Sequence, residues 1–237
     1  MKKLYLFLFF ICAGPTYAGV NTVSSPSITR GELTAEVGFG WENDDVSADF
    51  YEHRLEIGYA PVGYLKLEVE GTAQRVGADE LDYTSTTLKG TLMLLEQGEL
   101  SPVAAALRVE YKHAHAGGGA DAIDPRILLQ RKEGRAALVL NLGISKSVGD
   151  NSTSGVSGDL RASARYQLAD RVRGAIEYLG DTGTLHNMRG FAAQDHRLGP
   201  VAKIDLTEHA ALEIGYLAGI SADAPNHSVK MNMGFAF

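Results

Sequence analysis

The sequence predicts an all-β protein, a transmembrane antiparallel up-and-down β-barrel of about twelve strands, from three observations. Apolar and polar residues alternate with a period of two, in segments of about ten residues, which is the length of a tilted strand that crosses a bilayer. Short turns and longer loops follow one another along the chain. No apolar run after Ala18 approaches the roughly twenty residues that a membrane helix needs.

Twelve segments carry the alternation, with large apolar residues on one face and charged, polar or small residues on the other. The first six expected strands run about 32–41, 51–59, 65–70, 84–94, 103–112 and 126–132. The last six run about 138–145, 160–167, 172–178, 197–205, 212–218 and 229–237. The segment 126–132 is the least regular of them.

The links between these strands alternate in length. Links 60–63, 133–134, 169–170 and 207–209 are tight, and 96–102 is somewhat longer. Links 43–48, 76–82, 114–124, 148–158, 180–195 and 221–227 are longer and rich in Gly, Ser, Asn and Asp. This rhythm is typical of barrels with periplasmic turns and extracellular loops, and an even strand count places both chain ends on the turn side.

A soluble β-sandwich is the alternative fold, because it also alternates and turns often. The placement of the aromatic residues favours the barrel instead. Tyr59, Tyr64 and Tyr166 fall near the turn-side ends of expected strands, and Trp41 and Tyr111 fall near the loop-side ends. Two aromatic belts at the membrane interfaces explain that placement.

The final strand places five apolar residues on one face: Val229, Met231, Met233, Phe235 and Phe237. It resembles the last strand of bacterial outer-membrane β-barrel proteins of the porin-like class, which alternates in this way and ends in an aromatic residue. The resemblance covers the whole chain and names no single function. It implies that the barrel-assembly machinery reads this strand, and that outer-membrane lipid and lipopolysaccharide surround the barrel.

The other end of the chain predicts export. Lys2 and Lys3 precede a short apolar stretch, and Thr16 and Ala18 are small residues at a plausible cleavage site, so 1–18 reads as a cleaved signal peptide. Residues 19–31 are expected to form a periplasmic lead-in, and 32–237 the barrel. Cys12 is the only cysteine, and a lipoprotein would need a small residue in front of it. Export without cysteine excludes a disulfide scaffold and cysteine-based zinc or redox sites.

Net charge argues against one class of partner. Without Lys2 and Lys3, the 22 basic residues fall to 20 against 29 acidic ones. A chain with this excess of negative charge is a poor binder of nucleic acid.

The polar faces of the strands are expected to line the lumen. The residues so assigned are Glu32, Glu36, Arg54, Glu56, Lys66, Glu68, Glu70, Arg108, Glu110, Arg161, Arg165, Arg173, Lys203, Glu213 and Lys230. The first three strands supply an acidic wall and the later strands a mostly basic one. Opposite charges on the two walls create an electric field across the lumen, and such a field favours small polar or charged solutes. Two functions stay open: a narrow passive channel for these solutes, or a closed, side-chain-filled barrel with a structural, adhesive or loop-binding role.

No catalytic residue, cofactor or metal is expected. Outer-membrane phospholipases carry His-x-Ser with a distant Asn, whereas here His227 and Ser228 are adjacent. Barrel proteases carry Asp-x-Asp and Asp-x-His pairs, whereas Asp44 and Asp45, and Asp195 and His196, are adjacent. His113 and His115 share a strand face and could begin a metal site, but a polar rim accounts for them better.

Overall fold

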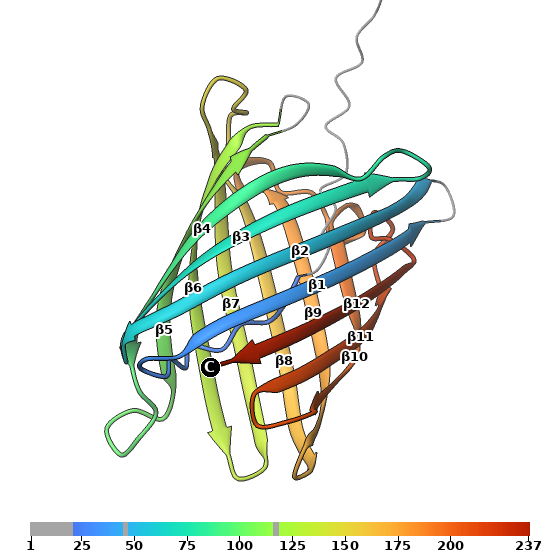
Figure 1. Ribbon diagram of the computed structural model, residues 1–237. Coiled ribbons are helices and arrows are strands. Elements are labelled where there is room, and N and C mark those ends of the chain that lie inside the picture. The colour runs from blue at the N-terminus through green and yellow to red at the C-terminus, as the bar shows by residue number, and fades with distance from the viewer. Residues whose placement is uncertain (1–20, 45–46, 116–118) are drawn as a thin grey trace, which may run out of the picture.

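The computed structural model describes residues 21–44, 47–115 and 119–237. Twelve antiparallel strands form a closed barrel in which each strand pairs with its neighbours in the chain, and the first pairs with the last (Figure 1). The predicted fold class is therefore confirmed, including the strand number and the up-and-down order. The expected signal peptide, residues 1–18, lies outside the described residues. No helix among the described residues is long and apolar enough to cross a membrane.

The strands of the first half are β1 (Leu33–Asp44), β2 (Ser47–Val62), β3 (Leu65–Val76), β4 (Asp82–Leu95), β5 (Ala104–Ala114) and β6 (Asp121–Glu133). Those of the second half are β7 (Ala136–Val148), β8 (Ser157–Ala169), β9 (Val172–Thr184), β10 (Asp195–Asp205), β11 (Ala210–Gly219) and β12 (His227–Ala236). Two single turns of 3₁₀ helix, η1 (Leu185–Asn187) and η2 (Phe191–Ala193), lie between β9 and β10.

Several strands run further toward the loops than expected, and the long link expected at 43–48 is wrong. β1 continues to Asp44, β2 begins at Ser47, and the two residues pair with each other. The carboxylate of Asp49 holds this end together, because it accepts hydrogen bonds from Trp41 Nε1 at 3.1 Å and Asn43 Nδ2 at 2.6 Å. Polar side chains thus hold the β1–β2 hairpin together beyond the point where apolar and polar residues cease to alternate.

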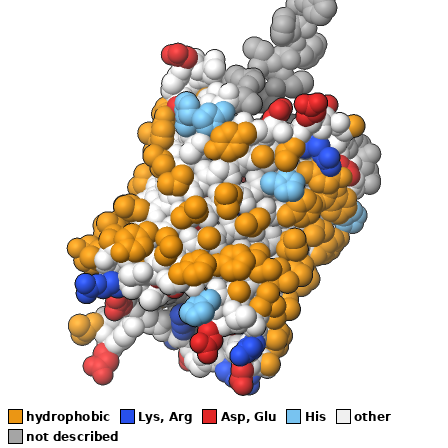
Figure 2. Space-filling view, viewed as in Figure 1, with side chains coloured by type: hydrophobic (Ala, Val, Ile, Leu, Met, Phe, Trp, Pro, Cys, Tyr) orange, Lys and Arg blue, Asp and Glu red, His pale blue; other side chains and the backbone are white. Residues whose placement is uncertain are grey.

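The barrel is apolar outside and charged inside. Leu55, Ile57 and Val69 are each more than half exposed on the outer face, whereas Glu177 and Lys230 are almost completely buried. Hydrophobic side chains cover the middle of the face in Figure 2, and charged ones gather toward its two ends. A soluble sandwich has the opposite arrangement, with its apolar face in the core. The outer surface therefore matches the hydrocarbon layer of a membrane.

The first and last strands meet at the turn side of the barrel. Phe237 and Leu33 exchange backbone hydrogen bonds at 2.9 and 3.1 Å, which completes the seam between β12 and β1. The turn-side links are 63–64, 96–103, 134–135, 170–171 and 206–209. Apart from the β1–β2 hairpin, the loop-side links are longer as a group: 77–81, 115–120, 149–156, 185–194 and 220–226.

Candidate functional site

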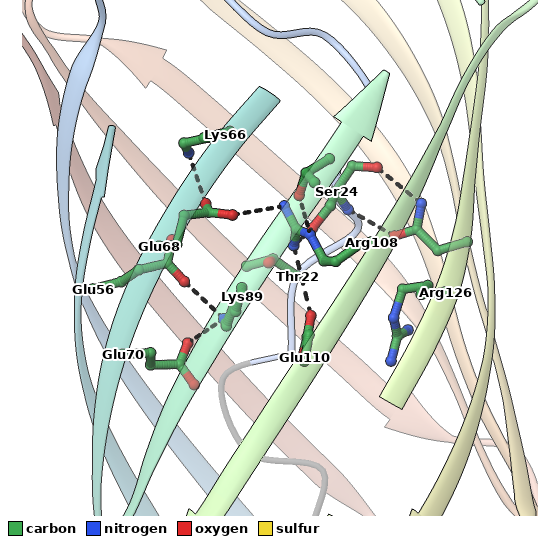
Figure 3. A network of polar contacts seen from close by, with 12 residues as sticks. Thr22, Ser24, Glu56, Lys66, Glu68, Glu70, Lys89, Arg108, Glu110 and Arg126 are labelled. Carbon is green, nitrogen blue, oxygen red and sulfur yellow. Dashed lines mark hydrogen bonds and ion pairs between the residues drawn. The ribbon is translucent and has the colours of Figure 1, made fainter. Parts of the chain in front are cut away.

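The first charged cluster lies on the lumen wall made by β1 to β4. Lys89 donates hydrogen bonds to Glu56 at 2.7 Å and to Glu70 at 2.6 Å (Figure 3). Arg54 pairs with Glu36 and lies 3.4 Å from Glu70. These cations come from β2 and β4, next to the carboxylates they neutralise. The acidic wall expected from the sequence is therefore largely neutralised within itself, and less by cations across the lumen.

Arg108 of β5 extends this cluster. Its guanidinium donates to Thr91 Oγ1 at 2.9 Å and to Glu68 at 3.3 Å, and it lies 3.8 Å from Glu110 (Figure 3). Glu68 also pairs with Lys66 at 2.7 Å. Buried pairs of this kind add little net stability, but removing one partner leaves an unpaired charge in a poorly solvated place. The network thus fixes the positions of the wall side chains more than it strengthens the fold.

A second charged wall is made by β6, β8, β9 and β12. Its ion pairs are Arg126–Asp159 at 2.5 Å, Arg161–Asp159 at 3.2 Å, Arg165–Glu177 at 4.0 Å, Lys230–Glu177 at 2.6 Å and, reaching β11, Lys230–Glu213 at 3.2 Å. Asp159 and Glu177 are each shared by two cations. This wall is therefore richer in positive charge than the first.

Residues 21–27 run inside the barrel, against this second wall (Figure 1). The Ser24 amide donates to Asn141 Oδ1 at 2.8 Å, and the Ser24 carbonyl accepts from Asn141 Nδ2 at 2.8 Å. Gln130 Oε1 accepts from the hydroxyls of Ser25 at 2.8 Å and Ser27 at 3.3 Å. We call residues 21–27 the inner segment. It belongs to the stretch expected as a periplasmic lead-in, and the domain boundaries themselves stay predictions.

Lumen cations hold the inner segment as well. The contacts are Arg165 to the Val23 carbonyl at 2.5 Å, Arg161 to the Thr22 carbonyl at 3.4 Å, Lys230 to the Asn21 carbonyl at 3.4 Å and Arg108 to Ser24 Oγ at 3.0 Å. Because charged donors make the stronger hydrogen bonds, the second wall is occupied by a peptide where water or a solute could otherwise bind.

A small apolar cluster lies within this charged interior. Val139 of β7, Leu179 of β9 and Leu217 of β11 point inward, and Val23 of the inner segment packs among them. All four are buried. Apolar side chains on the lumen face would otherwise contact water, so the cluster explains why the segment docks at this level. We call these three barrel residues the Val23 socket.

Open space remains beside the inner segment. A cavity of about 260 Å³ is bounded by the segment on one side and by residues such as Glu56, Lys89, Arg165 and Lys203 on the others. A wider space of about 520 Å³ at the turn side shares Glu56 and Lys203 with it. At the loop side a pocket of only about 50 Å³ lies around Asn21. Of these three spaces between described residues, the two larger ones therefore lie at the centre and the turn side, and the smallest lies at the loop side.

Arg197 of β10 borders the small loop-side pocket and fills part of the lumen there. It is 1% exposed, pairs with Glu42 of β1 and lies 2.5 Å from Asp195. Its guanidinium also donates to Ser228 Oγ at 3.1 Å. Because β10 and β1 are separated by two strands, this side chain reaches over the inner faces of β11 and β12. Lys230 of β12 crosses β11 in the same way to reach Glu177, and Gly215 of β11 leaves room for it, since a Cβ there would lie 2.9 Å from Lys230 Cε.

Most of the residues expected to line the lumen border the central cavity, and the others lie elsewhere in the barrel interior or at its edge. Those that border the central cavity are Glu36, Arg54, Glu56, Lys66, Glu68, Arg108, Arg165, Arg173, Lys203 and Glu213. Glu70 and Lys230 are buried in the ion-pair networks, Arg161 borders the loop-side pocket, and Glu110 lies beside Arg108. Glu32 precedes β1 and is half-buried. Their role in lining a conducting path stays a prediction.

The prediction left out residues that matter for the shape of the lumen. Glu42 continues the inward series of β1, and Arg126 shares the inward face of β6 with Gln130, so their parity could have identified both. Alternation does not identify the Val23 socket, because an isolated apolar residue on a polar strand face resembles a chance exception to the pattern.

The predicted assembly strand lies at the seam. Val229, Met231, Met233 and Phe235 of β12 point outward, between β11 and β1, and Phe237 is 71% exposed at the turn side. A free aromatic edge at the chain end is a surface that another protein can read. Its role in assembly stays a prediction.

The adjacent Asp and His residues that failed the hydrolase motifs have structural partners. Asp195 pairs with Arg197, and His196 contacts Tyr178 at 2.7 Å and Gln194 at 2.8 Å while Phe191 stacks on its ring. Within the described ranges no group of three or more His, Cys, Asp or Glu residues could hold a metal ion. Asp45 lies outside the described residues.

Solved structures with a similar fold were found. The COG4313 outer membrane channel from Pseudomonas putida F1 matches with a TM-score of 0.70 and 12% identity, covering 92% of this chain and 100% of that chain. The fold is that of outer-membrane channels and porins. The KdgM porin gives 0.62 and 8%, over 86% and 99% of the two chains, and the NanC porin gives 0.60 and 11%, over 86% and 98%. No family model matches the sequence, and no curated protein matches it.

Proposed function

We propose that this chain is a Gram-negative outer-membrane barrel that passes small polar or charged solutes passively through a narrow lumen. One observation carries the proposal: at the centre of the barrel the inner segment lies beside a cavity of about 260 Å³, whereas the interlocked pair of Arg197 and Glu42 lies at the loop side. A segment held by hydrogen bonds can give way to a solute, whereas interlocked buried charges cannot without large cost.

The charged lining favours polar solutes over apolar ones. Arg165, Lys203 and Glu56 all border the cavity, so a permeating molecule meets both signs of charge. The KdgM porin was solved in complex with disordered oligogalacturonate, which supports a polar, acidic solute for a barrel of this shape.

Conductance in a planar bilayer tests the proposal. The purified full-length protein is expected to give small, stepwise currents, because the inner segment leaves only a narrow passage. A barrel that stays silent, even when the hold on the segment is weakened, would favour the alternative of a closed barrel with a structural, adhesive or loop-binding role.

Export and assembly belong to the same proposal. A cleaved signal peptide over 1–18 would deliver the chain to the periplasm, and the strand that ends in Phe237 would be read by the barrel-assembly machinery. Outer-membrane lipid and lipopolysaccharide would surround the apolar outer face. Fractionation of expressing cells should recover the barrel in the outer membrane, and recovery as a soluble periplasmic protein would contradict this.

Phe237→Asp tests the assembly role. Phe237 is largely exposed and packs little, so its loss should barely change the stability of a finished barrel. The expected result is a clear drop in the yield of heat-modifiable barrel on gels. Tyr64→Asp, another exposed aromatic at the turn side, is the matched control and should reduce the yield less. Equal yields for the two variants would count against an assembly signal.

A further inference from the structure

The inner segment occupies a site whose chemistry is specific. Lys230, Arg161 and Arg165 hold the carbonyl oxygens of three successive residues, Asn21, Thr22 and Val23. The contact of Arg165 is the shortest, at 2.5 Å, and the Arg165 Nε also donates a hydrogen bond to Ser163 Oγ at 3.1 Å. A neutral carbonyl is a weaker partner for a guanidinium than a carboxylate, which can accept two parallel hydrogen bonds.

The carboxylates of the second wall are too few to pair closely with each of its cations, so these cations can bind a further anion. Asp159 is divided between Arg126 and Arg161, and Glu177 between Arg165 and Lys230. The guanidinium of Arg165 lies 4.0 Å from Glu177, beyond hydrogen-bond distance. A bound carboxylate would therefore gain a closer ion pair than Arg165 has within the barrel.

The Val23 socket adds a second, apolar requirement. Val139, Leu179 and Leu217 come from three different strands and bury the Val23 side chain, while the carbonyl of the same residue faces Arg165. The Val23 socket and the Arg165 guanidinium thus contact two groups of the same residue, its side chain and its carbonyl. A purely hydrophilic anion would satisfy the cation but leave the socket exposed to water.

We propose that the place now taken by Thr22 to Ser24 is a binding site for small carboxylates that carry a compact apolar body. The inner segment is its built-in occupant, with the Val23 side chain standing for the apolar body and the Val23 carbonyl for the carboxylate. The adjoining cavity of about 260 Å³ gives such a solute a way to the site from the turn side. This inference deepens the proposed function, because it names the solute class that the channel would select.

Thiol labelling in the purified full-length protein tests the site without any need for conductance. Val23→Cys introduces a cysteine into the socket, and Cys12, the only natural one, lies in the stretch expected to be cleaved. The probes are benzoate, benzyl alcohol and gluconate: an apolar body with a carboxylate, an apolar body without charge, and a carboxylate on a hydrophilic body. Benzoate should displace the segment and accelerate labelling severalfold, whereas the other two should have little effect.

Two further variants make the result decisive. Ser152→Cys, in the exposed link between β7 and β8, should label quickly and equally with every probe. Arg165→Gln combined with Val23→Cys should raise the basal labelling rate and shift the half-maximal benzoate concentration upward by about tenfold, the value of one lost charge-assisted hydrogen bond.

Several outcomes would overturn the site. Labelling of Val23→Cys as fast as Ser152→Cys without any probe would show that the segment is not docked. No acceleration by benzoate would rule out the site itself. Acceleration by gluconate as strong as by benzoate, or equal acceleration by all three probes, would show that the site does not require an apolar body. A protein that is silent in bilayers but responds to benzoate here would contradict the channel while supporting the site, so the two failures are distinguishable.

Discussion

The two charged walls of the lumen contain similar residues, but the charges and hydrogen-bonding groups of these residues find different partners. On β1 to β4, cations and carboxylates pair within the wall, as Lys89 does with Glu56 and Glu70. On the second wall the cations share carboxylates and complete their hydrogen bonds on the backbone of the inner segment, as Arg165 does on Val23. The first wall is thus built as a fixed structure, and the second as a surface that accepts a replaceable partner.

Breaking the first wall should have the largest effect. Lys89→Met would leave Glu56 and Glu70 without their shared cation, which costs about 3–5 kcal/mol for a buried pair. Denaturant-induced unfolding in lipid vesicles measures this loss. The matched control is Arg131→Met, because Arg131 pairs with Glu133 in an exposed place where the pair contributes about 0–1 kcal/mol. Similar losses in both variants would mean that the first wall is not a fixed structure.

Charge placed on the outer face should have the next largest effect. Ala162 and Arg165 both lie on β8, but three positions apart they point to opposite faces. Ala162→Arg should impair insertion by about 2–4 kcal/mol, because the new charge faces lipid. Arg165→Glu should still insert and should shift the reversal potential toward cation selectivity. Normal insertion of the first variant together with failure of the second would reverse the assignment of inside and outside.

Loosening the second wall should have a smaller and more local effect. Asn141→Leu removes both hydrogen bonds to Ser24, which weakens docking of the inner segment by about 1–3 kcal/mol. Hydrogen exchange at the Ser24 amide should then accelerate, while the strands keep their protection. Asn151→Leu, in the exposed β7–β8 link, should leave that exchange unchanged. Loss of protection throughout the barrel would show that Asn141 supports the fold and not the segment alone.

The same contrast explains what could be predicted from the sequence. Strand number and the two faces follow from alternation, which a barrel in lipid requires on every strand, so alternation places charged residues such as Glu68 and Lys230 inward. Alternation does not predict the full length of the β1–β2 hairpin, because polar contacts to Asp49 hold its end. The alternation does not predict the inner segment, because Ser24, Ser25 and their neighbours read as a linker and the barrel residues that hold them are more than eighty positions away.

Single-channel conductance of the wild type and Asn141→Leu, measured side by side, tests whether the replaceable inner segment narrows the lumen. We expect small currents for the wild type and larger or more frequent openings for the variant, with unchanged barrel content by heat modifiability. Asn151→Leu should behave as the wild type. A silent wild type together with a silent, correctly folded Asn141→Leu barrel would contradict a role of the inner segment in limiting conduction.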